Sequence, residues 1–284
     1  MRSRKVIIKR RKERARKFAL VVGALAFSLG LLSWAAHFPT VRLADITIQG
    51  NSAVSAEELS AVVAEQVNGA YLFLFPKDNV LLYPSRAIRE TILDRFKRVS
   101  SVDVRLSGFM KPGLVVTVNE RSPFALWCGV TQPMPDKNES HSCTFTDSTG
   151  FIFGFAPRIS PGVYFELYGP LSTATGTKEI DNSPIGKNFL TPDRFTRVLH
   201  FKDMLDDIDI KARSLVVNEN GFAEFSLSDA GVITFDPHDD LLKVFSNLKA
   251  AIAKKTTEEG AIAWDKLEYI DLRFSDKVIF KFRQ

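Results

Sequence analysis

The sequence has 284 residues, 45% hydrophobic and 25% charged, which is the composition of folded material and leaves room for one to three domains. Its net charge of +5 is spread unevenly, because residues 1–17 hold ten of the 38 Lys and Arg residues and a single acid, Glu13. The rest of the chain carries 28 basic and 32 acidic residues, or −4, so its mildly acidic bulk argues against a nucleic-acid-binding protein.

An uncharged run, Phe18–Ala36, follows the basic tail directly. Nineteen residues in a helix span roughly 28 Å, close to the roughly 30 Å hydrocarbon core of a bilayer. Residues 18–36 are therefore predicted to be a transmembrane helix. The positive-inside rule then places residues 1–17 in the cytoplasm and everything after Pro39 outside.

Three other interpretations of this N-terminal region are open. The apolar run could belong to a cleaved signal peptide, for which Ser33-x-Ala35 offers small residues at a cleavage site. It could be a buried core helix, and the basic tail could be a nucleic-acid patch. The length of the apolar run and the ten basic residues beside it favour a retained membrane anchor.

The first external segment, residues 41–121, has the pattern of a β-α-α-β-β module. Ser55 and Glu58 are spaced as a capping box at the start of its first helix. The pattern predicts a strand at 41–50, a helix at 54–67, an apolar loop at 71–83, a helix that begins at Pro84-Ser85, and strands at 99–107 and 113–120.

The second external segment, residues 122–284, is rich in strands and has two predicted helices. Thr191-Pro192 is a typical helix start, and the apolar periodicity runs to about residue 209. A second helix is predicted at about 240–254, after a three-strand meander over 213–235. The whole chain is thus assigned to the α+β class, with a mixed, mainly antiparallel β domain at its C-terminal side.

Cys128 and Cys143 both lie in the segment predicted to be external, where disulfides persist. Each flanks a strand-like run, so a hairpin joined by a disulfide is the simple interpretation. Two unrelated thiols and a metal site with His141 are the alternatives.

No catalytic motif with the required spacing occurs in the sequence. The four histidines are far apart along the chain, and Cys128 has no evident general base. We therefore predict no catalytic, cofactor-binding or metal-binding residues, and no enzymatic activity.

The last strand-forming segment is YIDLRFSDKVIFKF, from Tyr269 to Phe282. Ile270, Leu272 and Phe274 alternate with polar neighbours, and the pattern resumes at Val278. No later segment of the sequence is predicted to pair with it, so its outer edge is expected to be open. Its charges could simply guard that edge against aggregation.

Several of these segments together resemble the bacterial cell-division family FtsQ/DivIB. ITIQGN, from Ile46 to Asn51, resembles the opening of a POTRA domain, and Glu120, Arg121, Pro123 and Ala125 match the family's Glu-Arg-x-Pro-x-Ala junction. DSTGFIF, from Asp147, resembles the family's Asp-x-x-Gly hairpin, and LEYIDLRFSDKV, from Leu267, resembles its terminal Tyr-Ile-Asp-Leu-Arg-Phe strand. The cysteine pair is not a general family feature.

The resemblance implies a non-enzymatic scaffold at the division septum, without a cofactor. It implies a single-pass protein of the cytoplasmic membrane, anchored by residues 18–36, with a POTRA domain at 41–121 and a β domain at 122–284. The partners implied are small coiled-coil proteins like FtsB and FtsL and other division membrane proteins, with effects on septal peptidoglycan synthesis. Alternatives are a POTRA protein for secretion or envelope assembly, a membrane-anchored cell-wall enzyme and a periplasmic sensor.

In the family, an FtsB-type partner adds to the terminal part of the β domain. An edge strand suits this, because its unpaired backbone groups can bond to a partner strand. Ile279 interrupts the polar face and is the strongest candidate for a contact. The candidate partner-binding residues are Tyr269, Asp271, Arg273, Phe274, Lys277, Ile279 and Lys281.

Overall fold

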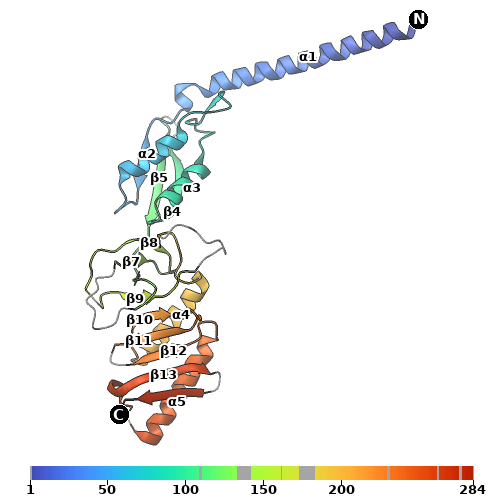
Figure 1. Ribbon diagram of the computed structural model, residues 1–284. Coiled ribbons are helices and arrows are strands. Elements are labelled where there is room, and N and C mark those ends of the chain that lie inside the picture. The colour runs from blue at the N-terminus through green and yellow to red at the C-terminus, as the bar shows by residue number, and fades with distance from the viewer. Residues whose placement is uncertain are drawn as a thin grey trace. The chain divides into compact units, whose positions relative to one another are not determined.

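The computed structural model describes residues 2–108, 111–132, 142–160, 162–172, 183–228, 231–260, 262–274 and 277–283, with backbone only for 2–13 and 259. It is a mixed α/β protein with five α-helices in these ranges (Figure 1). The chain divides into two compact units, one ending at Glu120 and the other beginning at Arg121. Most of the loop that the sequence predicts at 130–142 lies outside the described residues, as do residues 173–182 of the one predicted near 170–190.

Helix α1 (Arg2–Ala36) contains the predicted membrane span. Its segment Arg14–Ala36 has 23 residues and contains an 18-residue stretch with a mean hydropathy of 2.0, enough to cross a membrane by length and composition. A signal sequence would pass the same test. None of this segment is buried inside the protein, so the alternative of a buried core helix is wrong.

The first unit is built on a three-stranded sheet in the order β1-β5-β4. β1 (Ile46–Gln49) is parallel to β5 (Gly113–Glu120), and β4 (Val99–Ser107) is antiparallel to it. Helices α2 (Ala56–Val67) and α3 (Ser85–Arg95) pack against β1, β4 and each other. Half-buried Ile46 and Ile48 of β1 pack against a core of buried aliphatic side chains from the other elements, among them Leu59, Val63, Ile88, Ile92, Leu114, Val116 and Val118.

The helix starts in this unit follow from local sequence. Ser55 caps α2 as predicted, but its side-chain oxygen accepts from the N–H of Glu57, at 3.2 Å, rather than from Glu58. Helix α3 begins at Ser85, as predicted. The predicted loop at 71–83 contains a short hairpin that the sequence did not indicate, β2 (Ala70–Tyr71) paired with β3 (Phe75–Pro76).

The second unit is built on a nine-stranded sheet in the order β14-β13-β12-β11-β10-β9-β6-β7-β8. The pairs β6–β9, β9–β10 and β12–β13 are parallel, and the other neighbouring pairs are antiparallel. The strands are β6 (Ala125–Trp127), β7 (Thr144–Thr146), β8 (Ile152–Phe155), β9 (Phe165–Tyr168), β10 (Ala212–Val217), β11 (Ala223–Leu227), β12 (Val232–Phe235), β13 (Leu267–Phe274) and β14 (Lys277–Phe282).

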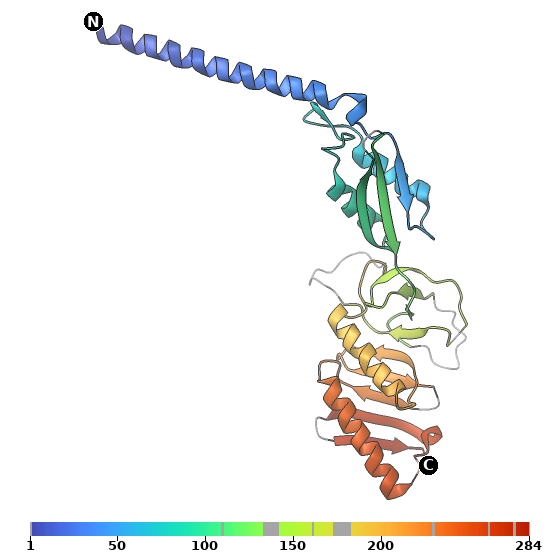
Figure 2. The same ribbon diagram turned by 180° about the vertical axis from the view of Figure 1, so that it is seen from behind.

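Helices α4 (Pro192–Asp206) and α5 (Leu241–Glu259) lie on the same face of this sheet (Figure 2). Phe201 of α4 packs against strands β11 and β12. Its ring centroid lies 5.0 Å from that of Phe235 and 5.9 Å from that of Phe225. All three are fully buried. Helix α5 begins after Asp240, whose carboxylate accepts from two backbone N–H groups, and it extends about a turn beyond its predicted end.

Two adjacent charged residues at the unit boundary each bind within their own unit. The carboxylate of Glu120 accepts from the backbone N–H groups of Ser52 (2.6 Å), Ala53 and Val54 (2.9 Å each), and from Arg98 (3.2 Å). Burial raises the pKa of Glu120, but these hydrogen bonds outweigh it and the net pKa is lowered.

The guanidinium of Arg121 pairs with Asp147 and lies over the ring of Phe151, 4.1 Å from its centroid. Asp147 also accepts from the hydroxyl and N–H of Thr149, which fixes the turn before β8.

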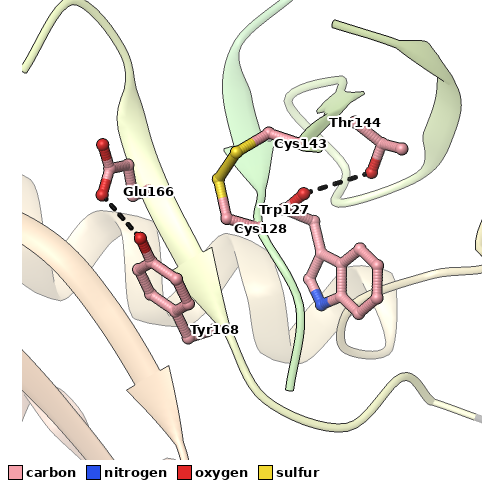
Figure 3. Close-up of a disulfide and its surroundings, with 6 residues drawn as sticks. All are labelled: Trp127, Cys128, Cys143, Thr144, Glu166 and Tyr168. Atoms are coloured by element: carbon pink, nitrogen blue, oxygen red, sulfur yellow. Dashed lines mark hydrogen bonds between the residues drawn. A yellow bond between two sulfur atoms is a disulfide. The ribbon is translucent and has the colours of Figure 1, made fainter. Parts of the chain in front are cut away.

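Cys128 and Cys143 form a disulfide beside β6 and β7 (Figure 3). Thr144 donates to the carbonyl of Trp127 at 3.3 Å, so a hydrogen bond joins the same two chain segments. On the neighbouring strand β9, the hydroxyl of Tyr168 donates to Glu166 at 2.8 Å. Burial and this carboxylate raise the pKa of Tyr168, which stays protonated at physiological pH.

Replacing both cysteines by serine is expected to lower the free energy of unfolding by about 3 kcal/mol, since the disulfide closes a loop of 15 residues and restricts the unfolded chain. The measurement is guanidinium unfolding followed by the fluorescence of Trp127 and Trp264. Wild type unfolded under reducing conditions should match the double variant, and Ser142→Ala is the neutral control. An unchanged unfolding midpoint in the double variant would contradict the expectation.

Candidate partner-docking edge

The predicted docking residues come together on the β13–β14 hairpin, because antiparallel pairing places them opposite one another. Tyr269 pairs with Lys281, Asp271 with Ile279, and Phe274 with Lys277. Cross-strand neighbours in such pairs have Cβ atoms about 5 Å apart. Arg273 is the remaining member and lies between two of these pairs on β13.

The hairpin has one face toward the helices and one face away from them. Val278, Phe280 and Phe282 pack against the main core, and Lys255 of α5 lies over the rings of Phe280 and Phe282, at 5.9 and 5.1 Å. Side chains alternate along a strand, so Ile279 and Lys281 point to the open face. Ile279 is half-buried, and Lys277 and Lys281 are exposed.

Asp271 is less accessible than its place on the open face suggests, with 7% of its surface exposed. Arg273 holds its carboxylate with two side-chain hydrogen bonds, from Nε at 2.9 Å and Nη2 at 2.6 Å. This bidentate contact lowers the pKa of Asp271 and raises that of Arg273. Asp271 therefore positions Arg273 rather than offering a charge of its own.

Phe274 departs from the predicted alternation. It was expected on the buried side with Ile270 and Leu272, but 52% of it is exposed, whereas those two are buried. The reason is a register shift between Asp271 and Phe274, which breaks the period of two at the end of β13. This leaves an exposed aromatic ring beside Lys277.

Cations and aromatic rings alternate over the open face. Lys281 lies 5.5 Å from the ring of Tyr269, and Arg273 lies 5.3 Å from the ring of Phe222. Lys281 also pairs with Glu268 at 2.8 Å, which raises the pKa of Lys281. Phe222 was missed by sequence reasoning, because only the pairing of β11, β12 and β13 brings it near Arg273.

β14 has a single sheet neighbour, β13, in the part of the chain that the structure describes, and Figure 1 draws it as the last strand of the sheet. A strand in this position presents a row of backbone N–H and C=O groups to whatever approaches it. The geometry suits addition of an extended segment, with Ile279 and Phe274 supplying apolar contacts and Lys277 and Lys281 supplying charge.

Two of the histidines that are far apart in sequence line the same groove. His200 of α4 and His238, just before α5, both contribute to its wall. His238 pairs with Asp236 at 2.7 Å. Among the described residues, no group of three or more His, Cys, Asp or Glu side chains is arranged to hold a metal ion.

No family model matches the chain, and no curated protein matches its sequence. The geometry of the hairpin and the sequence motifs are therefore the grounds for the functional proposal.

Arg273→Ala is expected to raise the pKa of Asp271, because the buried carboxylate loses the cation that stabilises its charged form. In the wild type the folded-state pKa is lowered, so the contact contributes stability above the unfolded pKa of about 4 and loses it as pH falls through the folded value. The stability difference between variant and wild type should therefore shrink on acidification.

The measurement is a carbon NMR titration of the Asp271 carboxyl, together with urea unfolding at several pH values. Arg283→Ala removes an exposed arginine just beyond β14 and serves as the control. An Asp271 pKa that is the same in Arg273→Ala and wild type would show that Arg273 does not stabilise the carboxylate.

Proposed function

We propose that this chain is a non-enzymatic scaffold of the FtsQ/DivIB type, anchored in the cytoplasmic membrane at the division septum. It binds small coiled-coil partners like FtsB and FtsL, contacts other division membrane proteins, and so helps to regulate septal peptidoglycan synthesis. The observation that carries the proposal is the open edge strand β14, whose neighbour β13 holds the motif Tyr269–Phe274 on which the resemblance partly rests.

The membrane topology in this proposal has residues 1–17 in the cytoplasm and both folded units outside. The apolar segment of α1 supports a span, and the ten basic residues before the run 18–36 support this orientation. The Cys128–Cys143 disulfide is consistent with it, since disulfides persist outside the cytoplasm.

The first unit is proposed to be a POTRA-type module that contacts other division proteins. Its order of β1, α2, α3, β4 and β5 supports this, as does the packing of both helices with a three-stranded sheet. The β2–β3 hairpin is an addition between the two helices.

In the docking step, an extended segment of the partner bonds to the free edge of β14. The backbone bonds give affinity, and the side chains on the hairpin give specificity. Lys277, Lys281 and Arg283 place three cations on or just beyond the edge strand, which favours a partner segment with acidic residues. The exposed ring of Phe274 and the half-buried Ile279 favour apolar residues at alternate positions of the partner.

Ile279→Ala is expected to weaken partner binding at least about tenfold, the equivalent of about 1.4 kcal/mol, because it removes the apolar contact at the centre of the edge. Lys277→Glu should weaken it further through repulsion of an acidic partner, and high salt should reduce this second effect. The measurement is biolayer interferometry with the full-length chain in detergent and the FtsB- and FtsL-like proteins of the same organism.

Phe155→Ala is the matched control, because Phe155 is an exposed apolar residue on β8, at the other edge of the same sheet. Point substitutions are needed because deletion of β13 and β14 would remove the buried Ile270 and Leu272 from the core. Thermal unfolding confirms that each variant is folded. Equal loss of binding in Phe155→Ala and Ile279→Ala, or binding that neither affects, would rule out docking at β14.

A further inference from the structure

The tip of the β2–β3 hairpin places two large apolar residues in an unfavourable backbone conformation. Leu72 and Phe73 have φ angles of +50° and +61°, and the N–H of Leu74 donates to the carbonyl of Tyr71 at 3.0 Å. Residues 71–74 therefore form a tight turn with positive φ at both central positions, where Asn-Gly is the favoured sequence. Leucine and phenylalanine are strained there, which is typical of residues kept for a function.

The same two side chains are almost fully exposed. Phe73 is 99% exposed and Leu72 is 83% exposed, and Leu81, on the loop that follows β3, is 86% exposed. Strained backbone and exposed hydrocarbon are both unfavourable in water, and neither contributes to the core of the unit. The combination indicates that these three residues, the apolar tip, are covered by something other than water.

Hydrogen bonds connect the hairpin and the loop after it to the end of the predicted membrane span. The hydroxyl of Ser33, in the last turn of α1, donates to the carbonyl of Leu74 at 2.6 Å. The side-chain amide of Asn79 donates to the carbonyl of Ala36 at 3.0 Å, and Asn79 is itself buried. Leu32 and Ala35 of the helix line one apolar groove with Phe75 and Leu81. The hairpin is therefore held beside residues at the outer end of the apolar segment.

Side chains typical of a membrane interface lie at the same level. Trp34 and Phe38 make an edge-to-face contact at 4.6 Å, and Trp34 is 67% exposed. Lys77 lies 5.7 Å from the ring of Tyr71, at the base of the hairpin. Trp, Tyr and Lys with this arrangement are found where hydrocarbon meets the headgroup layer.

We infer that the apolar tip, Leu72, Phe73 and Leu81, inserts into the outer leaflet of the same bilayer that α1 crosses. The inference rests on the proposed anchoring by α1. A lipid surface is the occupant that fits, because Leu74, which follows Phe73 in the hairpin, accepts a hydrogen bond from Ser33 of the apolar segment, so the tip lies near the depth where that segment leaves the hydrocarbon. The second contact would restrict rotation of the first unit about the end of the span.

The test uses the full-length chain in phosphatidylcholine–phosphatidylglycerol vesicles, with an environment-sensitive NBD fluorophore on Phe73→Cys. The native cysteines do not react, because they form a disulfide. Leu25→Cys in α1 reports on anchoring. Ala56→Cys is the aqueous control, an exposed residue at the start of α2, roughly 17 Å along the helix axis from its end near β2.

The Phe73 probe is expected to shift to shorter wavelength and to lose most of its emission to nitroxide-labelled lipid, as the Leu25 probe does, while the Ala56 probe does neither. A probe on Leu81→Cys should be quenched as well, and should lose most of that quenching when Leu72 and Phe73 are both replaced by Asp. Because these side chains are exposed, the substitutions do not disturb the core.

Quenching of the Leu25 probe without quenching of the Phe73 probe would overturn the inference and leave the anchor intact. Absence of quenching at both positions would show instead that α1 does not span the bilayer. In that case both the proposed anchoring and the inference would be wrong. If the Phe73 probe is shielded only after the FtsB- and FtsL-like proteins are added, the tip is a protein contact and the inference is wrong.

Discussion

The contact of Phe201 with Phe225 and Phe235 determines which face of the second unit's sheet is covered by helices. It holds α4 against the centre of the nine-stranded sheet, and α5 extends the same layer over the strands toward β14. Three buried aromatic rings supply much of the apolar area removed from water at this interface. Both helices lie on one face of the sheet, so they leave the open face of the β13–β14 hairpin uncovered. The helix–sheet core thus sets the orientation of every residue in the docking hairpin.

The hairpin β13–β14 shows how an open edge can be kept soluble and still be usable. Phe280 and Phe282 are anchored against α5, so the strand does not depend on a partner for its position. Lys277 and Lys281 on its outward side discourage pairing with a second copy of the same strand, which would bring like charges together. A partner segment with acidic side chains meets no such penalty. The same two lysines therefore attract an acidic partner segment and repel a second copy of β14.

Local patterns in the sequence predicted most helices and strands, while long-range pairing was beyond them. The Thr191-Pro192 start of α4 and the alternation in β13 are local; the structure follows the first, and it buries Ile270 and Leu272 as the second predicts but not Phe274. The parallel pairing of β9 with β10 joins segments separated by α4, and no local residue pattern predicts it. The β2–β3 hairpin was missed because Leu72-Phe73 is not a turn sequence. In the docking hairpin, the alternation indicated most residues of the open face, but not their cross-strand pairs, the bidentate contact of Asp271 with Arg273 or the register shift that exposes Phe274.

Glu120 and Arg121 show that a sequence motif can have a purely structural reason. Glu120 fixes the turn before α2 by accepting from three consecutive N–H groups, and Arg121 fixes the turn before β8 through Asp147. The two units therefore meet in the sequence with no linker residue between their anchoring side chains. Loss of either charge acts first on the unit to which that side chain is bonded. The Glu-Arg pair is thus accounted for by folding alone, whereas the exposed apolar residues of the hairpin β13–β14 and of the tip of β2–β3 have no such structural reason.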